Sequence, residues 1–194
     1  MDDVSERILD AAVEAASVHG IGRMSVADVA TRAGLSRPSV YKRYPSKDAL
    51  VAAAVGREAL RVVDATRQAA AGIEDPREAL AAAVATMLRL AREHPLLDRV
   101  VRTEPERPVP LFTTDDGLVL AAVRPEIEVV IAHRFPTMGP VSCRRVADML
   151  ARLLISYALN APDDPPEVVA DVLAAVIVDG ATSLVDAPHA LGAR

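Results

Sequence analysis

Apolar residues at helical spacing, interrupted by capping residues, glycines and prolines, recur along the whole of this 194-residue chain. No segment alternates apolar and polar residues as a half-buried strand does. The pattern therefore predicts an all-α fold with about nine helices. The expected helices span residues 5–19, 26–33, 37–43, 46–71, 75–94, 96–102, 115–134, 141–160 and 166–186.

Proline positions refine these boundaries. Three prolines between Thr103 and Thr114 predict a loop. Pro125 lies inside the helix expected over 115–134, and we expect that helix to be kinked or split there, because proline lacks the amide hydrogen of a helical bond.

The composition limits the kinds of core and site that the chain can form. Hydrophobic residues make up 51% of the chain and aromatic residues only 3%, so aliphatic side chains must build the core. The single cysteine, Cys143, excludes an internal disulfide and a multi-cysteine metal site, and we expect it to be a buried apolar residue. No metal and no cofactor are expected.

Two further features concern location. The first residues, Met1-Asp2-Asp3, are acidic where a secretory signal would be basic. The longest apolar stretch, 168–178, contains Asp171 and is too short to span a bilayer. The sequence predicts a soluble, cytoplasmic protein without membrane contact.

Charge is distributed unevenly along a chain whose net charge is −5. Residues 20–47 carry six basic side chains and one carboxylate, Asp28, whereas the flanking segments are acidic. A basic segment of this kind is the electrostatic pattern expected of a nucleic-acid contact, although short basic faces are often merely solvated.

The segment Ser25–Leu50 combines this charge with the spacing of a helix-turn-helix. Gly34 permits a sharp turn between two short helices, Leu35 fills the gap between them, and Ser36 caps the second. Val40 would anchor the second helix internally. The exposed positions of that helix are then polar, cationic or aromatic, as a major-groove helix requires: Arg37, Ser39, Tyr41, Lys42 and Arg43.

At these residues the sequence resembles the tetracycline-repressor (TetR) family of bacterial transcription regulators. The similarity covers residues 3–63, with Tyr44 where phenylalanine is usual, Ser25 where threonine is commoner, and Pro38 where small residues are frequent. The residues that match the family pattern are Ser25, Ala30, Ala33, Gly34, Leu35, Ser36, Val40, Tyr41, Tyr44, Lys47 and Leu50.

The resemblance implies a three-helix DNA-binding domain over 3–63 and a helical ligand-binding and dimerisation domain over 64–190. Ser25 and Lys47 would bind phosphates, and Tyr41 would contact a phosphate or a thymine methyl group. The predicted DNA-binding residues are Ser25, Ser36, Arg37, Ser39, Tyr41, Lys42, Arg43 and Lys47. Core packing is expected for Val40 and Tyr44, and solvation for Arg23 and Arg32; DNA contact is the alternative for all four.

The two closing helices predict dimerisation independently of the resemblance. Residues 166–186 are apolar on nearly all sides, with a narrow polar strip through Glu167 and Asp171, and residues 141–160 have a similarly narrow strip. Such helices are usually buried on both sides, and a four-helix bundle with a second subunit explains this economically. The alternative is a fully internal pair of helices. A homodimer would place two recognition helices roughly 34–36 Å apart on a palindromic operator.

A ligand pocket is the part of the prediction that depends most on the resemblance. The resemblance implies a repressor released by a small molecule that shifts the helix over 46–71. An aliphatic lining would favour a hydrophobic effector, and core packing is the alternative for every candidate. The candidate pocket residues are Leu90, His94, Val101, Phe112, Ile127, Ile131, Leu153 and Tyr157.

Two other functional classes are possible in principle. An enzyme would have to use Cys143 with His133 or His189, or Ser183 with Asp186, and none of these lies in a recognisable catalytic signature. A lipid carrier would share the aliphatic interior without needing the helix-turn-helix. We therefore expect no enzyme activity.

Overall fold

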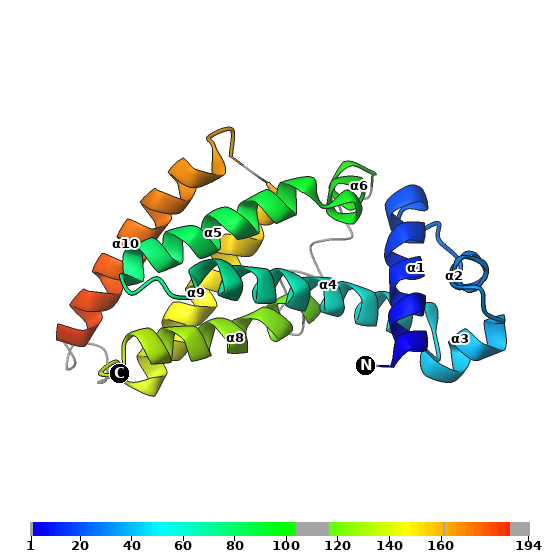
Figure 1. Ribbon diagram of the computed structural model, residues 1–194, viewed down its shortest axis with the longest axis horizontal. Coiled ribbons are helices and arrows are strands. Elements are labelled where there is room, and N and C mark those ends of the chain that lie inside the picture. The colour runs from blue at the N-terminus through cyan, green and yellow to red at the C-terminus, as the bar shows by residue number, and fades with distance from the viewer. Residues whose placement is uncertain (1, 104–116, 161, 187–194) are drawn as a thin grey trace. The chain divides into compact units, whose positions relative to one another are not determined.

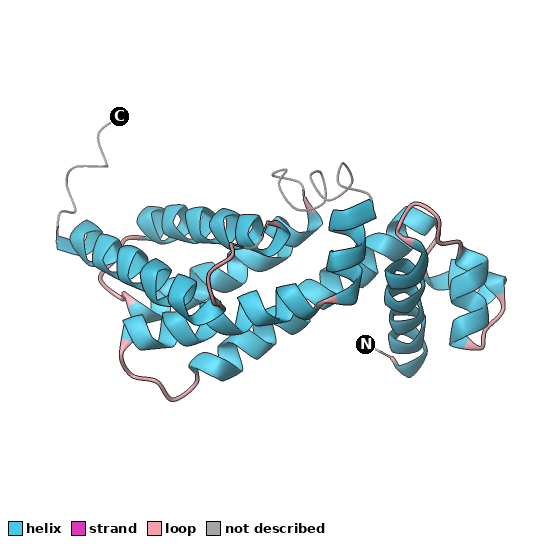
Figure 2. Cartoon of the chain, turned by 90° about the horizontal axis from the view of Figure 1, so that it is seen from above, coloured by secondary structure: helices cyan, strands magenta, loops and turns pink. Residues whose placement is uncertain are grey.

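The computed structural model describes residues 2–103, 117–160 and 162–186. Within these ranges there are nine α-helices and no strand, which confirms the all-α prediction (Figure 2). The helices are α1 (Asp3–His19), α2 (Val26–Ala33), α3 (Arg37–Arg43), α4 (Lys47–Ala70), α5 (Pro76–Glu93), α6 (Pro95–Thr103), α8 (Leu118–Arg134), α9 (Pro140–Leu159) and α10 (Pro166–Asp186) (Figure 1).

The chain forms two compact units, each of which combines two separate stretches of the sequence. The N-terminal unit contains Met1–Ala59 together with Glu93–Val119, and the second unit contains Leu60–Arg92 with Leu120–Arg194. Helix α6 thus belongs to the N-terminal unit, where it packs against α1. The functional domains 3–63 and 64–190 remain a proposal based on sequence.

Helix α1 begins two residues before the predicted start at Ser5. The side chain of Asp2 accepts a hydrogen bond from the Ser5 amide at 2.8 Å and so caps the helix. An aspartate at this position satisfies one of the free amides at a helix start. At the other end, Gly20 has a φ of 81° and its amide donates to the Ala16 carbonyl.

The core of the N-terminal unit is aliphatic, as the composition predicts. Helix α1 packs against α2 and α6, and α2 packs against α3. Burial of these side chains provides the main driving force for folding, about 1.5–3 kcal/mol for each large one. The large apolar side chains that are almost completely buried here are Ile8, Leu9, Met24, Val29, Val40 and Leu50.

Two apolar clusters hold the second unit together. One joins α5 to α10 through residues such as Leu88 and Leu173, and Leu153 and Tyr157 of α9 pack against it. The other joins Cys143 and Val146 of α9 to Ala181 of α10. The start of α9 therefore lies beside the end of α10, and the two helices are antiparallel.

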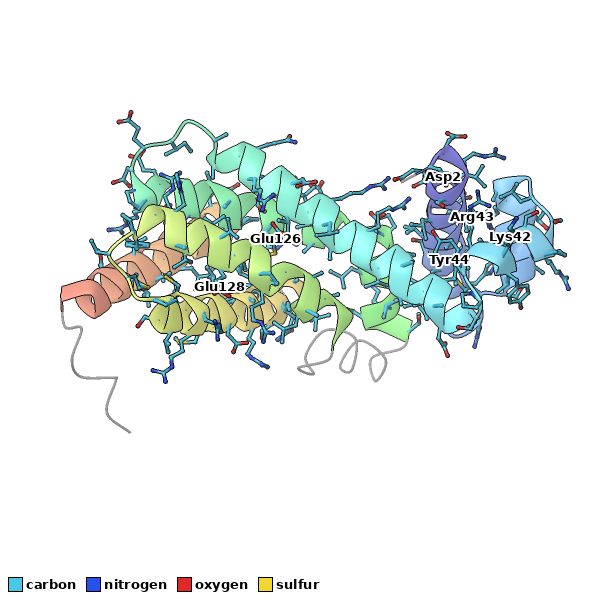
Figure 3. The ribbon with its side chains drawn as sticks, turned by 90° about the horizontal axis from the view of Figure 1, so that it is seen from below. Asp2, Lys42, Arg43, Tyr44, Glu126 and Glu128 are labelled. Atoms are coloured by element: carbon cyan, nitrogen blue, oxygen red, sulfur yellow. The ribbon has the colours of Figure 1, made fainter. Side chains whose placement is uncertain are left out.

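Ion pairs add further links within this unit. Arg67 of α4 pairs with Glu126 of α8, and Arg144 of α9 lies 3.8 Å from Glu128 of α8; both glutamates are labelled in Figure 3. The two arginines are exposed and the two glutamates half-buried, so such pairs contribute little to stability.

Helix α8 continues through Pro125, so the predicted split is wrong. Leu120 and Ile131, on either side of the proline, are both buried, whereas Pro125 is exposed. Packing on both sides explains how one helix tolerates the loss of a backbone hydrogen bond at the proline. No described helix combines the length and apolar character that crossing a membrane requires.

Candidate nucleic-acid interface

The first helix of the predicted helix-turn-helix, α2, is fixed at its start by a reciprocal cap. The Asp28 amide donates to Ser25 Oγ at 3.2 Å, and the Ser25 amide donates to Asp28 Oδ2 at 3.0 Å. Hydrogen bonds from the Ser25 side chain and then from its backbone lower the pKa of Asp28. The capping box expected from sequence is thus present.

The turn between α2 and α3 depends on Gly34. Its φ of 64° lies in the left-handed region, which side chains with a Cβ rarely occupy. The Leu35 amide donates to the Ala30 carbonyl at 2.9 Å and closes the turn. Arg7 of α1 covers this turn, donating to the Ala33 carbonyl.

Helix α3 presents a polar and cationic outer face. Ser36 caps it by accepting from the Ser39 amide, and the two hydroxyl groups lie 2.8 Å apart. Val40 is completely buried, which confirms core packing at that position and fixes the rotation of the helix. The predicted contact residues that are exposed on α3 are Arg37, Tyr41, Lys42 and Arg43.

Two of the basic side chains are paired with acidic residues of α1 or its cap. Arg43 Nη2 lies 2.9 Å from Asp2 Oδ2 (Figure 3), and Arg32 Nη1 lies 2.7 Å from Glu14 Oε1. Hydrogen bonds from the Ser5 and Arg43 side chains hold the pKa of Asp2 well below its usual range. In this structure Arg43 and Arg32 are therefore engaged, whereas Arg37 and Lys42 have no side-chain partner among the described residues.

Lys47 makes a structural contact that the sequence did not indicate. Its Nζ donates to the Gly22 carbonyl at 2.8 Å, and its side chain is half-buried. It therefore ties the start of α4 to the loop between α1 and α2. Ser46, as predicted, caps α4 by accepting from the Ala49 amide at 3.0 Å.

A buried arginine on α4 was also missed. Arg57, only 9% exposed, pairs with Glu6 and Asp10 of α1 at 3.0 and 2.9 Å and with Glu58 at 2.8 Å. Burial alone would lower its pKa, but the hydrogen bond and charge of Glu58, together with Asp10 and Glu6, raise it. The four-residue spacing of Glu6 and Asp10 on α1 was the available signal.

The candidate pocket residues are distributed over both units. Leu153 and Tyr157 meet at one apolar cluster, and Ile127 and Ile131 meet at the other. His94 lies in the N-terminal unit, where its Nε2 is 3.5 Å from Glu58 Oε2.

The remaining three candidates are not brought together with these. Val101 is half-buried in α6, and Leu90 is half-buried in α5. Phe112 lies outside the described residues.

Cys143 has the properties of a core residue. It is buried, its thiol donates to the Met138 carbonyl at 3.5 Å, and burial, with the nearby charge of Glu128, raises its pKa. A thiol held protonated is a poor nucleophile. The side chain of Ser183 and all of His189 lie outside the described residues, which contain no cluster suited to a metal ion.

Two family models match the chain. Residues 8–54 match "Bacterial regulatory proteins, tetR family", and residues 75–179 match "Bacterial Tetracyclin repressor, C-terminal domain". The second match alone covers more than half of the chain.

Individual proteins agree with this assignment. The HTH-type transcriptional regulator Rv2250c of Mycobacterium tuberculosis is 32% identical over 166 residues, which cover 80% of this chain and 79% of that protein. The TetR family repressor AlkX from Dietzia sp. has a TM-score of 0.73 at 23% identity, covering 91% of this chain and 97% of AlkX. FadR from Bacillus subtilis has a TM-score of 0.62 at 15% identity, covering 90% and 98%.

These matches span both the helix-turn-helix and the helical segment after it, in the order in which this chain carries them. They exclude the enzyme alternative, because members of this family regulate transcription by binding DNA. The chain belongs to the tetR family of bacterial regulatory proteins and is a helix-turn-helix transcriptional regulator.

Proposed function

We propose that this regulator is a repressor that binds a palindromic operator as a homodimer and leaves it when a hydrophobic small molecule binds. The observation that carries the DNA-binding part is the outer face of α3. Arg37, Tyr41 and Lys42 are exposed there, while Val40 on the opposite side is completely buried. A short helix held in this rotation offers hydrogen-bonding and cationic groups to the major groove.

The contacts expected of each residue follow from what already engages it. Arg37 and Lys42 are available for bases or phosphates, and Tyr41 is available for a phosphate or a thymine methyl group. Ser39 and Ser36 contribute through the start of α3, where the helix dipole favours an anion. Ser25 and Lys47 are each held by a hydrogen bond within the protein, so any phosphate contact must coexist with it.

The dimer is proposed to form through α9 and α10, in line with the expected segments 141–160 and 166–186. Exposed apolar side chains on these helices support it, because a monomer seldom leaves so many on adjacent helices. The residues concerned are each at least half exposed: Val141, Met149, Val168, Val172 and Val176.

The effector is proposed to be hydrophobic. AlkX is implicated in biodegradation of n-alkanes, and FadR of B. subtilis was crystallised with stearoyl-CoA. The aliphatic clusters of the second unit, which include Leu153, Tyr157, Ile127 and Ile131, suit a ligand of that kind. Leu90, His94, Val101 and Phe112 stay candidates from the sequence alone.

The test is a DNA-binding titration on the promoter region of the regulator's own gene across a range of salt concentrations. The proposal expects the logarithm of the affinity to fall linearly with the logarithm of salt concentration. Long-chain acyl-CoA and n-alkane are then added as probes, and at least one is expected to release the DNA. Absence of DNA binding at low salt would contradict the operator proposal. Binding that neither probe weakens would contradict the hydrophobic-effector part alone.

A further inference from the structure

We infer that the homodimer is held in register by a charged pair between Arg145 of α9 and Asp171 of the partner subunit, formed twice by symmetry. This inference rests on the dimer proposed above and specifies which surfaces of the two copies meet. It concerns only α9 and α10, which are adjacent in the second unit (Figure 1).

The exposed strips of the two helices have the same spacing and opposite charge. On α9 the strip runs through Val141, Arg145, Met149 and Arg152. On α10 it runs through Val168, Val172, Val176 and Asp179, with Asp171 beside Val172. Both strips therefore place apolar residues at the first and third positions and a charged residue at the fourth, basic on α9 and acidic on α10.

The direction of the helices determines how two such strips can meet. Because α9 and α10 are antiparallel within a chain, a two-fold axis perpendicular to them makes α9 parallel to α10 of the partner subunit. With the two strips aligned from their first residues, Val141 faces Val168 of the partner subunit. Met149 then faces the partner's Val176.

The same alignment matches the charges. Arg145 faces the partner's Val172 and its neighbour, the partner's Asp171, and Arg152 faces the partner's Asp179. In the opposite, antiparallel alignment, Arg145 would face the partner's Val176 instead, and burying its charge without a counterion would be unfavourable. Charge complementarity therefore selects the parallel arrangement.

Arg145 and Asp171 are the residues best placed to take part. Both are exposed, and neither has an ion-pair partner among the described residues. Arg152, by contrast, already lies 2.8 Å from Asp148 of its own chain. A second copy of the chain would give Arg145 and Asp171 the partners that they lack within one subunit.

The test uses two charge reversals, Arg145→Glu and Asp171→Arg, in the full-length protein. Each variant alone would place two like-charged pairs across the dimer, and its dissociation constant is expected to rise about 100-fold. Mixed together, the two variants can form a heterodimer in which both pairs are again of opposite charge. Sedimentation equilibrium is expected to show that the mixture dimerises within about tenfold of the natural affinity. Arg77→Glu, an exposed reversal on α5, is the matched control and is expected to leave the dimer unchanged.

The outcomes separate this inference from the proposed function. If the unsubstituted protein stays monomeric at all concentrations, the proposed dimer itself is overturned. A dimeric natural protein whose two variants both dimerise normally overturns the charged pair and leaves the dimer standing. Variants that are monomeric alone and do not associate when mixed also overturn the pairing. Circular dichroism is used to confirm that each variant is folded.

Discussion

The guanidinium group of Arg43, the last residue of α3, lies 2.9 Å from the carboxylate of Asp2, the residue that caps α1. One carboxylate thus serves two helices: Oδ1 accepts from the Ser5 amide and Oδ2 accepts from Arg43. A DNA phosphate that approaches Arg43 must compete with Asp2 for the same cation. Asp2 therefore reduces the positive charge that α3 presents to a DNA phosphate.

Replacing Asp2 by asparagine is expected to strengthen DNA binding. Asparagine keeps the oxygen that caps α1 but removes the charge that holds Arg43. The affinity is expected to rise about two- to fivefold, the range of an exposed ion pair. The slope of log affinity against log salt should steepen by about 0.9 for each protomer, as one more phosphate is neutralised. Asp3→Asn, which removes an equal charge without releasing Arg43, is the control. An equal gain from Asp3→Asn would mean that only net charge matters.

Tyr41→Ala is expected to weaken DNA binding without affecting the fold. The side chain is 48% exposed on the outer face of α3, so its removal leaves no buried cavity. The expected loss is about 1–3 kcal/mol of binding free energy, the range for a side chain that contacts a base. Fluorescence anisotropy on operator DNA measures the affinity, and thermal melting checks the fold. A large drop in melting temperature would identify Tyr41 as a packing residue instead.

Lys47→Ala is expected to affect stability as well as DNA binding. The variant loses the hydrogen bond from Nζ to the Gly22 carbonyl, which contributes about 1 kcal/mol to the free energy of unfolding. Lys42→Ala, an exposed cation with no such bond, should weaken DNA binding while leaving stability unchanged. Urea denaturation of the two variants measures the difference. Equal stabilities would show that the Lys47 bond contributes nothing in solution.

The helix-turn-helix was predictable because its determinants are local. Ser25 with Asp28, Gly34 and Ser36 are each recognisable within a few residues, and the structure reproduces the predicted bounds of α2 and α3. The same local rules misplaced the start of α1, because both Asp2 and Ser5 are suitable capping residues. Only the structure shows that Asp2 accepts the hydrogen bond.

Contacts between distant segments could not be predicted from the sequence. The pairing of Arg57 with Glu6 and Asp10 requires knowing which faces of α1 and α4 meet. Similarly, the apolar residues of α10 divide into buried ones, such as Leu173, and exposed ones, such as Val172. Composition cannot separate these two sets, because the division depends on the position of the neighbouring helices.

The cap of α2 predicts a dependence of stability on pH. The pKa of Asp28 is lowered in the folded protein, so its carboxylate stabilises the fold above the unfolded pKa of about 3.9. This stabilisation is lost as the pH falls through the folded value. Denaturation followed from neutral to acidic pH should show falling stability below about pH 4, and Asp28→Asn should reduce that fall. Asp163→Asn, an exposed carboxylate in the loop before α10, should leave the profile unchanged.

Arg57→Met is expected to destabilise the N-terminal unit, because methionine keeps much of the volume but none of the charge. The side chain of Arg57 is 8% exposed, and that of Glu58 is 17% exposed, so Glu58 would be left as a poorly solvated anion. Glu6 and Asp10 are more exposed and regain water, which reduces the expected cost to about 2 kcal/mol. Urea denaturation of Arg57→Met and of the unsubstituted protein measures this loss in the free energy of unfolding.

The double variant Arg57→Met/Glu58→Gln tests the cause of that loss. Removing the least solvated anion should recover roughly half of the stability, because a poorly solvated carboxylate that has lost a buried cation costs more than the missing pair itself. If Glu58→Gln recovers nothing in the Arg57→Met background, the loss comes instead from the contacts of Arg57 with α1. In that case Glu6→Gln in the same background should not restore stability either, because Glu6 is more exposed and regains water.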